Sequence, residues 1–218
     1  MTSYLIELEE TLKVNFNREV SVSGDQIVRD AETRLDELIQ SGRLAGGKLL
    51  KIYGPISVPV AYVLAHKLVH LYSAIAVSDT RLKAYVIVTS TTPDYPVGSR
   101  INFESNTISE VKPENHTVSS FLINWDQGIL KTKFNSEAQV EGDQVVRDAE
   151  ARLEALINSG QIKGGKQPLL INGRSSVLVS FVMAHKLAHL YSAIAVYDPK
   201  IAVSELDRYI VVISHNSY

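Results

Sequence analysis

Residues 24–42 read GDQIVRDAETRLDELIQSG, and residues 142–160 read GDQVVRDAEARLEALINSG. These two stretches agree at 14 of 19 positions without a gap. A second pair, AHKLVHLYSAIAV at 65–77 and AHKLAHLYSAIAV at 184–196, agrees at 12 of 13. The offset is 118 residues in the first pair and 119 in the second. A period of this length is that of a domain rather than of a solenoid unit, so the sequence predicts two tandem copies of one fold.

Each copy repeats one predicted order of elements. A strand-like segment broken by a turn comes first, at 4–16 and again at 121–134. An amphipathic helix follows, in which Ile27, Ala31, Leu35 and Leu38 recur at spacings of three and four. Short apolar strands and a second helix, apolar almost all round, complete the copy. In the first copy the helix lies at 57–71 and the strands at 49–53, 74–77 and 85–88. The corresponding strands of the second copy lie at 169–172, 193–196 and 209–213.

Strands that alternate with helices predict an α/β sheet with crossover connections. The polar, Pro-containing stretch 109–120 is the predicted boundary, with a first copy at 1–112 and a second at 113–218. Tandem copies of such a unit commonly pack about an approximate two-fold axis. We therefore expect two α/β domains packed as a pseudo-two-fold dimer.

Composition narrows the function classes. The 218 residues carry a formal charge of −2, which argues against binding long nucleic acid but not against binding a small anion. With no cysteine, disulfides, thiolate zinc sites and cysteine nucleophiles are excluded. The most apolar stretches are too short to span a bilayer, and the N-terminal MTSYLIELEE is acidic where a signal peptide is basic. We expect a soluble cytoplasmic protein without membrane contact.

A strand–glycine–helix junction is the first candidate site. Gly54 and Ser57 stand between a strand and the apolar helix, and Gly173, Arg174 and Ser176 do so in the second copy. A helix N-terminus with a close glycine backbone can bind phosphate, and an arginine or serine adds a donor. The alternative is that both serines are ordinary N-caps.

The histidines form a second candidate site. His66 and His70, and likewise His185 and His189, stand four residues apart on one helix face. The sequence lacks the glutamate of the H-E-x-x-H zinc motif, which disfavours a zinc site. One histidine of each pair can face a cleft as general acid or base, or both can be packed helix residues.

Two aspartates directly follow short buried strands. Asp79 and Asp198 stand at the carboxyl ends of their strands, where open α/β sheets bind ligands. A carboxylate there can orient a histidine or hold a divalent cation. The alternative is a turn residue, which is common before a proline such as Pro199.

The pattern G-x-x-S…AHKLxHLYSAIAVxDP(K/R)…VVxSH resembles the small CRISPR-associated ring nucleases of the third family, found with type III systems. The resemblance spans nearly all of both copies, so the chain looks like a covalent dimer. It implies a Rossmann-like fold related to the domains that sense cyclic oligoadenylate. The implied substrate is cyclic tetra-adenylate, a second messenger of antiviral defence, and the implied reaction is its linearisation. Manganese is the implied cofactor, and self-association into a dimer of pseudo-dimers or a filament is implied for catalysis.

The resemblance also assigns residues by motif. His70 and His189 match the catalytic position, and Asp79 and Asp198, which match the aspartate of the motif, are the further candidate catalytic residues. The implied metal ligands are Asp198 and His215. The implied substrate-binding residues are Ser57, Ser176, Gly54, Gly173, Arg174, Arg81, Lys200, His66 and His185.

The two copies match the pattern unequally. The second reads YDPK and VVISH, ending in His215, whereas the first reads SDTR and VIVTS, with Ser90 assigned to the place of that histidine. We therefore expect the second copy to be the stronger catalytic half. The alternative functions are a non-catalytic sensor or sponge for cyclic oligoadenylate, and an assembly module in which these residues are structural.

Overall fold

The computed structural model describes residues 2–17, 20, 23–109, 119–138, 140–199 and 208–215. The first copy contributes two helices and seven strands: β1 (Tyr4–Leu8), β2 (Leu12–Phe16), α1 (Gly24–Gln40), β3 (Gly47–Tyr53), α2 (Val58–Leu68), β4 (Tyr72–Asp79), β5 (Ala84–Ser90), β6 (Arg100–Asn102) and β7 (Ile108–Ser109). The second contributes β8 (Phe121–Asp126), β9 (Ile129–Phe134), α3 (Gly142–Asn158), β10 (Leu169–Gly173), α4 (Val177–Leu187), the short 3-10 helix η1 (Ala188–Leu190), β11 (Ala193–Tyr197) and β12 (Tyr209–Ser214).

Each copy forms its own mixed sheet, which confirms the predicted α/β class. The first sheet has the order β1-β2-β3-β4-β5-β6-β7, and the second has the order β12-β11-β10-β9-β8. In both sheets three central strands run parallel, and the segment predicted as a broken strand is an antiparallel hairpin. The parallel strands are joined through the helices, so their carboxyl ends meet at one edge of each sheet.

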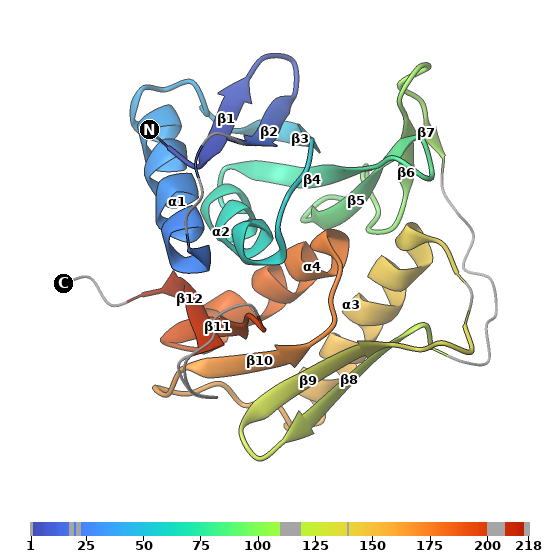
Figure 1. Ribbon diagram of the computed structural model, residues 1–218. Coiled ribbons are helices and arrows are strands. Elements are labelled where there is room, and N and C mark those ends of the chain that lie inside the picture. Colours follow the sequence, from blue (N-terminus) through green and yellow to red (C-terminus); the bar gives the residue numbers. More distant parts are fainter. Residues whose placement is uncertain are drawn as a thin grey trace.

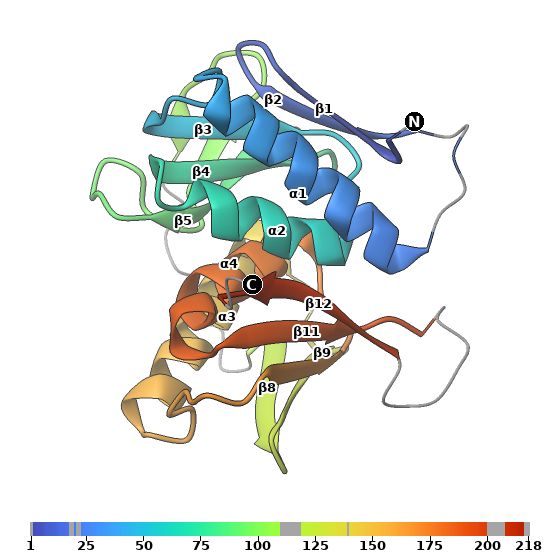
Figure 2. The same cartoon turned by 90° about the vertical axis from the view of Figure 1, so that its left-hand side faces the viewer.

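The two sheets form the outer layers, and the four helices lie between them (Figures 1 and 2). Neighbours in the helix layer are α1 with α2, α2 with α4, and α4 with α3. The packing is reciprocal, since α2 contacts β12 of the second copy and α4 contacts β5 of the first. This reciprocity is the predicted pseudo-two-fold arrangement, and α2 and α4 meet at its centre.

One hydrophobic core joins the copies. Tyr62 on α2 and Phe181 on α4 are fully buried, and the same core cluster includes residues from both sheets. The Tyr62 hydroxyl donates to Met183 Sδ at 3.5 Å across the helix pair. Because every helix packs on this shared interior, we expect the two copies to unfold together.

Repeated polar residues hold each long helix to its own sheet. The Asp30 carboxylate accepts from the backbone and side chain of Ser3 at 2.7 and 2.6 Å, and Asp148 does the same for Ser120. Lys67 forms ion pairs with α1 and its counterpart Lys186 with α3. These residues of the repeated sequence therefore have structural partners.

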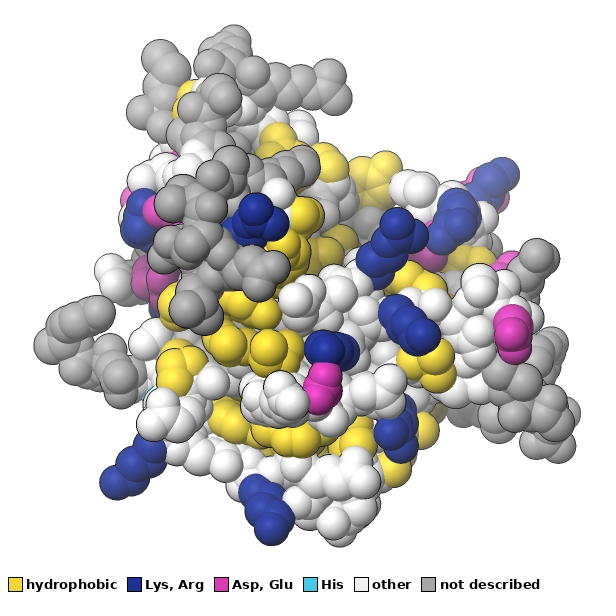
Figure 3. All heavy atoms as spheres, turned by 60° about the horizontal axis from the view of Figure 1, so that its bottom comes forward, with side chains coloured by type: hydrophobic (Ala, Val, Ile, Leu, Met, Phe, Trp, Pro, Cys, Tyr) yellow, Lys and Arg dark blue, Asp and Glu magenta, His cyan; other side chains and the backbone are white. Residues whose placement is uncertain are grey.

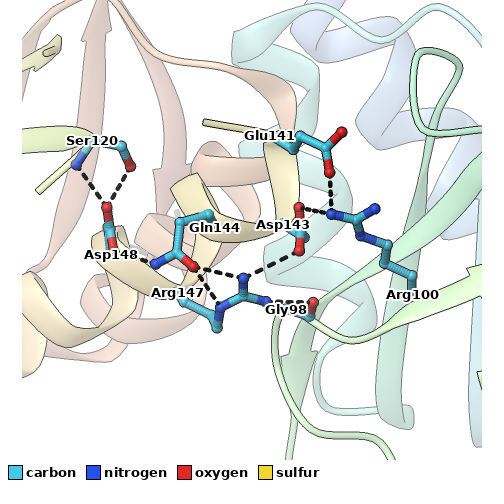
Figure 4. A network of polar contacts seen from close by, with 8 residues as sticks. All are labelled: Gly98, Arg100, Ser120, Glu141, Asp143, Gln144, Arg147 and Asp148. Carbon is cyan, nitrogen blue, oxygen red and sulfur yellow. Dashed lines mark hydrogen bonds and ion pairs between the residues drawn. The ribbon is translucent and has the colours of Figure 1, made fainter. Parts of the chain in front are cut away.

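An asymmetric extension crosses from the first copy to the second. Strands β6 and β7 follow β5, and Arg100 on β6 donates to Glu141 and to Asp143 at the start of α3 (Figure 4). Arg147, one turn along α3, donates to the Gly98 carbonyl at 2.9 Å and to Asp143 at 3.1 Å. The sequence did not predict these two strands, because they are only three and two residues long.

No helix in the described ranges combines the length and apolar character needed to cross a bilayer.

Candidate functional site

Helices α2 and α4 carry candidate residues at both ends. Their first turns, with Ser57 and Ser176, lie at the edge where the parallel strands end. Their last turns, with His66 and His185, lie at the opposite edge. The predicted site residues therefore fall into two groups at opposite ends of the central helix pair.

A cleft of about 590 Å³ opens at the strand-end edge, between the copies. The first copy contributes the start of α2, and the second contributes the ends of β9, β10 and β11. Its polar lining comes from Ser57, Tyr62, Thr132, Arg174, Ser175, Tyr197 and Asp198. This volume lies within the range of roughly 300–1,000 Å³ typical of small-molecule pockets.

Ser57 and Ser176 are both helix N-caps, which is the alternative that the sequence analysis gave beside phosphate binding. The Ser57 hydroxyl accepts from the Val60 N–H at 3.5 Å, and the Ser176 hydroxyl accepts from the Val179 N–H at 3.2 Å. The Ser57 N–H itself donates to the Tyr4 hydroxyl at 3.0 Å, and burial raises the pKa of Tyr4. Phe121 takes the place of Tyr4 in the second copy, so this contact exists only in the first.

The two glycines of the junction are required by the backbone. Gly54 has φ +124° and Gly173 has φ +120°. A Cβ at Gly54 would lie 1.9 Å from the Val14 carbonyl oxygen, and one at Gly173 would lie 1.9 Å from that of Thr132. Only glycine fits such a close approach between adjacent strands.

Arg174 distinguishes the second junction from the first. Its N–H donates to the Thr132 carbonyl at 3.0 Å, and its exposed side chain lines the cleft. Pro55, the counterpart of Arg174, has neither an N–H nor a charge. Arg174 is the one Lys or Arg side chain in the described lining of the cleft, so the positive charge there comes from the second copy.

A second hollow of about 370 Å³ continues from the cleft onto the outer face of the second sheet. It shares Thr132 and Gly173 with the cleft, and Lys131 and Lys133 also line it. Figure 3 views the molecule from this side and shows Lys and Arg side chains among hydrophobic patches. Arg174 and Lys133 offer positive charge to an anionic ligand despite the negative charge of the chain as a whole. Lys131 is paired with Asp126, and Asp198 also lines the cleft.

The two aspartates lie at the contact between copies. Asp79 accepts from the backbone N–H groups of Arg81 and Leu82 at 2.9 and 3.3 Å, which is a turn-stabilising role. Its carboxylate also faces Gly142, where an added Cβ would meet Oδ2 at 2.5 Å. Asp198 faces Gly24 of α1 in the same way and also lines the cleft.

The basic residues that follow the aspartates are placed differently. The Arg81 side chain is exposed near the turn, and the Arg81 backbone N–H donates a hydrogen bond to the Asp79 carboxylate. Lys200 lies outside the described residues. Neither aspartate is near the histidines, so the structure does not bring the predicted catalytic residues into one group.

Five histidines gather instead at the opposite edge, around a pocket of about 220 Å³. The first copy contributes His66, His70 and Thr91, and the second contributes His185, Lys186, His189 and His215. The sequence predicted two separate pairs. The structure joins these pairs because α2 and α4 pack against each other and bring their last turns together.

The rings lie close to one another. The ring centroids of His66 and His215 are 5.0 Å apart, and those of His66 and His70 are 6.4 Å apart. The Nε2 atom of His215 lies 2.7 Å from the Ala188 carbonyl oxygen. Because a carbonyl only accepts, Nε2 carries the hydrogen of this bond.

Burial disfavours the charged form of His66 and His185, the two partly buried histidines of the pocket. Burial, then the neighbouring His215 and His70, lower the pKa of His66 to about 4. Burial also lowers the pKa of His185, helped by the charges of Lys186 and His189. Both rings are therefore neutral at pH 7. The Nδ1 atom of His66 is buried and has no hydrogen-bond partner among the described residues.

The structure corrects one predicted correspondence between the copies. The His215 N–H donates to the Ser192 carbonyl at 2.9 Å, and in the first copy the Thr91 N–H donates to the Ser73 carbonyl at 2.8 Å. Thr91, rather than Ser90, is thus the counterpart of His215. The sequence analysis placed Ser90 there because it set VIVTS against VVISH, one residue out of register; Ser90 corresponds to Ser214.

The predicted metal ligands are far apart. Asp198 follows Tyr197, which pairs with Tyr209, whereas His215 follows Ser214, which pairs with Ala193 at the other end of β11. Five residues of strand separate the two by about 15–20 Å. Within one chain they cannot bind the same ion, and the described residues contain no cluster of three His, Asp or Glu side chains suited to a metal. The described residues of a single chain therefore do not fit a manganese site.

Comparison with known families gave one match, which covers part of the first copy. Residues 37–102, from the last turn of α1 to the end of β6, match the family described as CRISPR-associated protein (Cas_csx3). No match was found among curated proteins or among solved structures. The matched segment contains Ser57, His66, His70 and Asp79. It therefore confirms the CRISPR-associated part of the resemblance for the first copy, and the internal repeat extends the same elements to the second.

Proposed function

We propose that this chain binds cyclic tetra-adenylate and cuts its phosphodiester backbone, as a ring nuclease of CRISPR defence. The observation that carries the proposal is the convergence of five histidines from both copies around one pocket. A cleft with a cationic lining, also shared by the two copies, supplies a place for a phosphodiester ligand. The match of residues 37–102 to a CRISPR-associated family supports the choice of this ligand class.

Histidines are suited to both proton transfers of the reaction. The 2′-hydroxyl oxygen of one ribose attacks the adjacent phosphorus while a neutral histidine accepts the hydroxyl proton. The bond from phosphorus to the 5′-oxygen breaks, and a protonated histidine donates a proton to that oxygen. The product is a linear oligoadenylate with a 2′,3′-cyclic phosphate and a 5′-hydroxyl, and no net proton is consumed. The polar residues of the cleft would orient the ribose for in-line attack.

The cleft and the histidines of one chain cannot act on the same ring at once. Helix α2 has 11 residues and is about 16 Å long, and the two groups lie at its opposite ends. Catalysis in this proposal therefore takes place between chains, with the cleft of one chain holding the ring against the histidine pocket of another. The cut requires self-association.

Incubating the purified chain with cyclic tetra-adenylate, with and without manganese, tests the proposal. Linear tetra- or di-adenylate, resolved by chromatography, is the expected result. A ring that is bound but returned intact identifies a sensor or sponge instead. A ring that is neither bound nor cut leaves a structural role for the histidines.

Complementation tests catalysis between chains. Arg174→Ala removes the cation of the cleft, and a His70→Ala/His189→Ala chain lacks the exposed second histidine of each helix pair. We expect each variant alone to be inactive and an equal mixture to regain activity. Lys48→Ala, an exposed lysine on the first sheet, is the matched control for lost charge and leaves activity unchanged. An inactive mixture would contradict the arrangement.

A further inference from the structure

His215 belongs to the second copy but contacts the first. It follows β12, which packs on α2 of the first copy. Its ring lies edge-on to His66, with an interplanar angle of 78° and a centroid distance of 5.0 Å. The hydrogen bond from Nε2 to the Ala188 carbonyl fixes the ring from the other side. His215 therefore connects the end of α4 to the histidines of α2.

The other half of the pocket lacks this contact. Thr91 is the counterpart of His215, so by the pseudo-two-fold relation it is the residue that faces His185. Its hydroxyl donates to the Ser73 carbonyl of its own copy at 3.2 Å. His70 lies close enough to help lower the pKa of His185, but among the described residues no imidazole packs edge-on against His185 as His215 does against His66.

We infer that each chain holds one complete histidine centre, built from His66 and His70 of the first copy and His215 of the second. This inference rests on the proposed ring-nuclease function. His70, exposed at the end of α2, makes contact with the cyclic ligand as the catalytic residue, whereas His215, also exposed, is bonded through Nε2 to the Ala188 carbonyl. His66 and His215 are positioning residues, since the His66 ring contacts that of His70 and the His215 ring packs against His66.

The assignment reverses the expectation drawn from sequence. The motif is more complete in the second copy, which pointed to His189 as the stronger catalytic residue. The motif histidine of β12 instead supports the opposite copy, because the strand crosses the pseudo-two-fold interface. The first copy, with the shorter motif, becomes the active half, and His185 and His189 form the incomplete centre.

The matched pair His70→Ala and His189→Ala gives the first test. The two residues occupy the same position of the repeat, so the variants differ only in the centre that they remove. With cyclic tetra-adenylate as substrate, we expect His70→Ala to lower kcat about a hundredfold, as loss of a general acid or base does. His189→Ala should lower it no more than about threefold. Equal losses, or a larger loss in His189→Ala, would overturn the inference.

A double-mutant cycle tests the role of His215. A positioning role predicts that His215→Ala lowers kcat about tenfold and leaves KM unchanged, since the ring is held by the cleft of another chain. The loss should be non-additive with His66→Ala and additive with His185→Ala. His215→Gln, which keeps a donor for the Ala188 carbonyl, should recover part of the activity. An unfolding midpoint within about 2 °C of the parent excludes a merely structural effect. Additivity with His66→Ala would refute the contact.

A gain-of-function variant completes the test. Thr91→His places an imidazole opposite His185 and should complete the second centre. We expect it to restore cleavage to the inactive His70→Ala chain and to leave the His70→Ala/His189→Ala chain inactive. Failure of this restoration, in a chain that folds, counts against the assignment. If the parent chain leaves the ring intact, the proposed function itself fails, which distinguishes that outcome from an error in the choice of half.

Discussion

Replacing Asp143 by alanine should destabilise the chain far more than the same change at Asp25, its counterpart in the first copy. The Asp143 carboxylate is 1% exposed and bonds Arg100 at 2.8 Å and Arg147 at 3.1 Å (Figure 4). Asp25 is 46% exposed, and its ion pair within the described ranges is with Arg29 one turn along the same helix. Both aspartates lie in the first turn of a long helix, so their interaction with the helix dipole cancels in the comparison.

The expected difference follows from burial. Removing one partner of a buried ion pair costs about 3–5 kcal/mol, because the remaining charge is left unpaired. Here Arg100 keeps Glu141 and Arg147 keeps the Gly98 carbonyl, so we expect about 2–3 kcal/mol for Asp143→Ala. An exposed i,i+4 pair is worth about 0.3–0.5 kcal/mol, which is the expected cost of Asp25→Ala.

Urea unfolding and thermal unfolding, both followed by circular dichroism, measure the free energy and the midpoint temperature of each variant. For a chain of this length each kcal/mol shifts the midpoint temperature by roughly 2–4 °C, so Asp143→Ala should lower it by about 4–12 °C. Asp25→Ala should lower it by no more than about 2 °C. A difference between the two of less than about 0.5 kcal/mol would show that the extension β6–β7 is not anchored by this network.

Three further outcomes are expected. Burial and neighbouring histidines lower the pKa of His66 from 6.5 to about 4. Between these two values the unfolded chain binds a proton at this residue and the folded chain does not. The contribution of His66 to stability is therefore complete above pH 6.5 and is lost as the pH falls toward 4. The loss should be on the order of 1 kcal/mol after discounting for solvent access, and His66→Gln should remove it in an unfolding series over pH. Gly54→Ala should lower the free energy of unfolding by more than about 3 kcal/mol, since the added Cβ would lie 1.9 Å from a carbonyl oxygen. Gly42→Ala should lower it by only about 1 kcal/mol in the same urea titration, since no atom lies within 4 Å of the added Cβ. Fluorescence of Trp125, the single tryptophan, should follow the same urea transition as circular dichroism, whereas two separated transitions would show that the copies unfold independently.

Most helices and strands could be predicted from the sequence because the regular spacing of their apolar residues marks each of them locally. The spacing of Ile27, Ala31, Leu35 and Leu38 marks the face of α1 that packs inward, and the last three of these side chains are buried. The internal repeat predicted the pseudo-two-fold packing, since two copies with the same apolar helix can bury that helix against each other. Strands β6 and β7 were missed because two or three residues carry no readable alternation.

The site was less predictable because it depends on contacts between the copies. Each histidine pair was visible as an i,i+4 spacing, but only the packing of α2 against α4 brings the pairs together. The distance between Asp198 and His215 depends on strand pairing, which places them at opposite ends of β11. Thr91 became the counterpart of His215 only through the matching backbone hydrogen bonds to Ser73 and Ser192.

Two differences between the copies fall where the chain could meet a ligand. The stretches that form helices α1 and α3 agree at 14 of 19 positions, and the segments that end α2 and α4 and begin the next strand agree at 12 of 13. By contrast, Pro55 stands opposite Arg174 at the cleft, and Thr91 stands opposite His215 at the histidine pocket. In a dimer of identical chains, each of these substitutions would occur twice and would change both halves of the site. Joining the copies in one chain removes that constraint, so that one half can supply the cation of the cleft while the pocket is completed around the histidines of the other. The asymmetry that the structure shows is thus available only to the tandem form, which is why the paired variants at His70 and His189 test the architecture as directly as they test the chemistry.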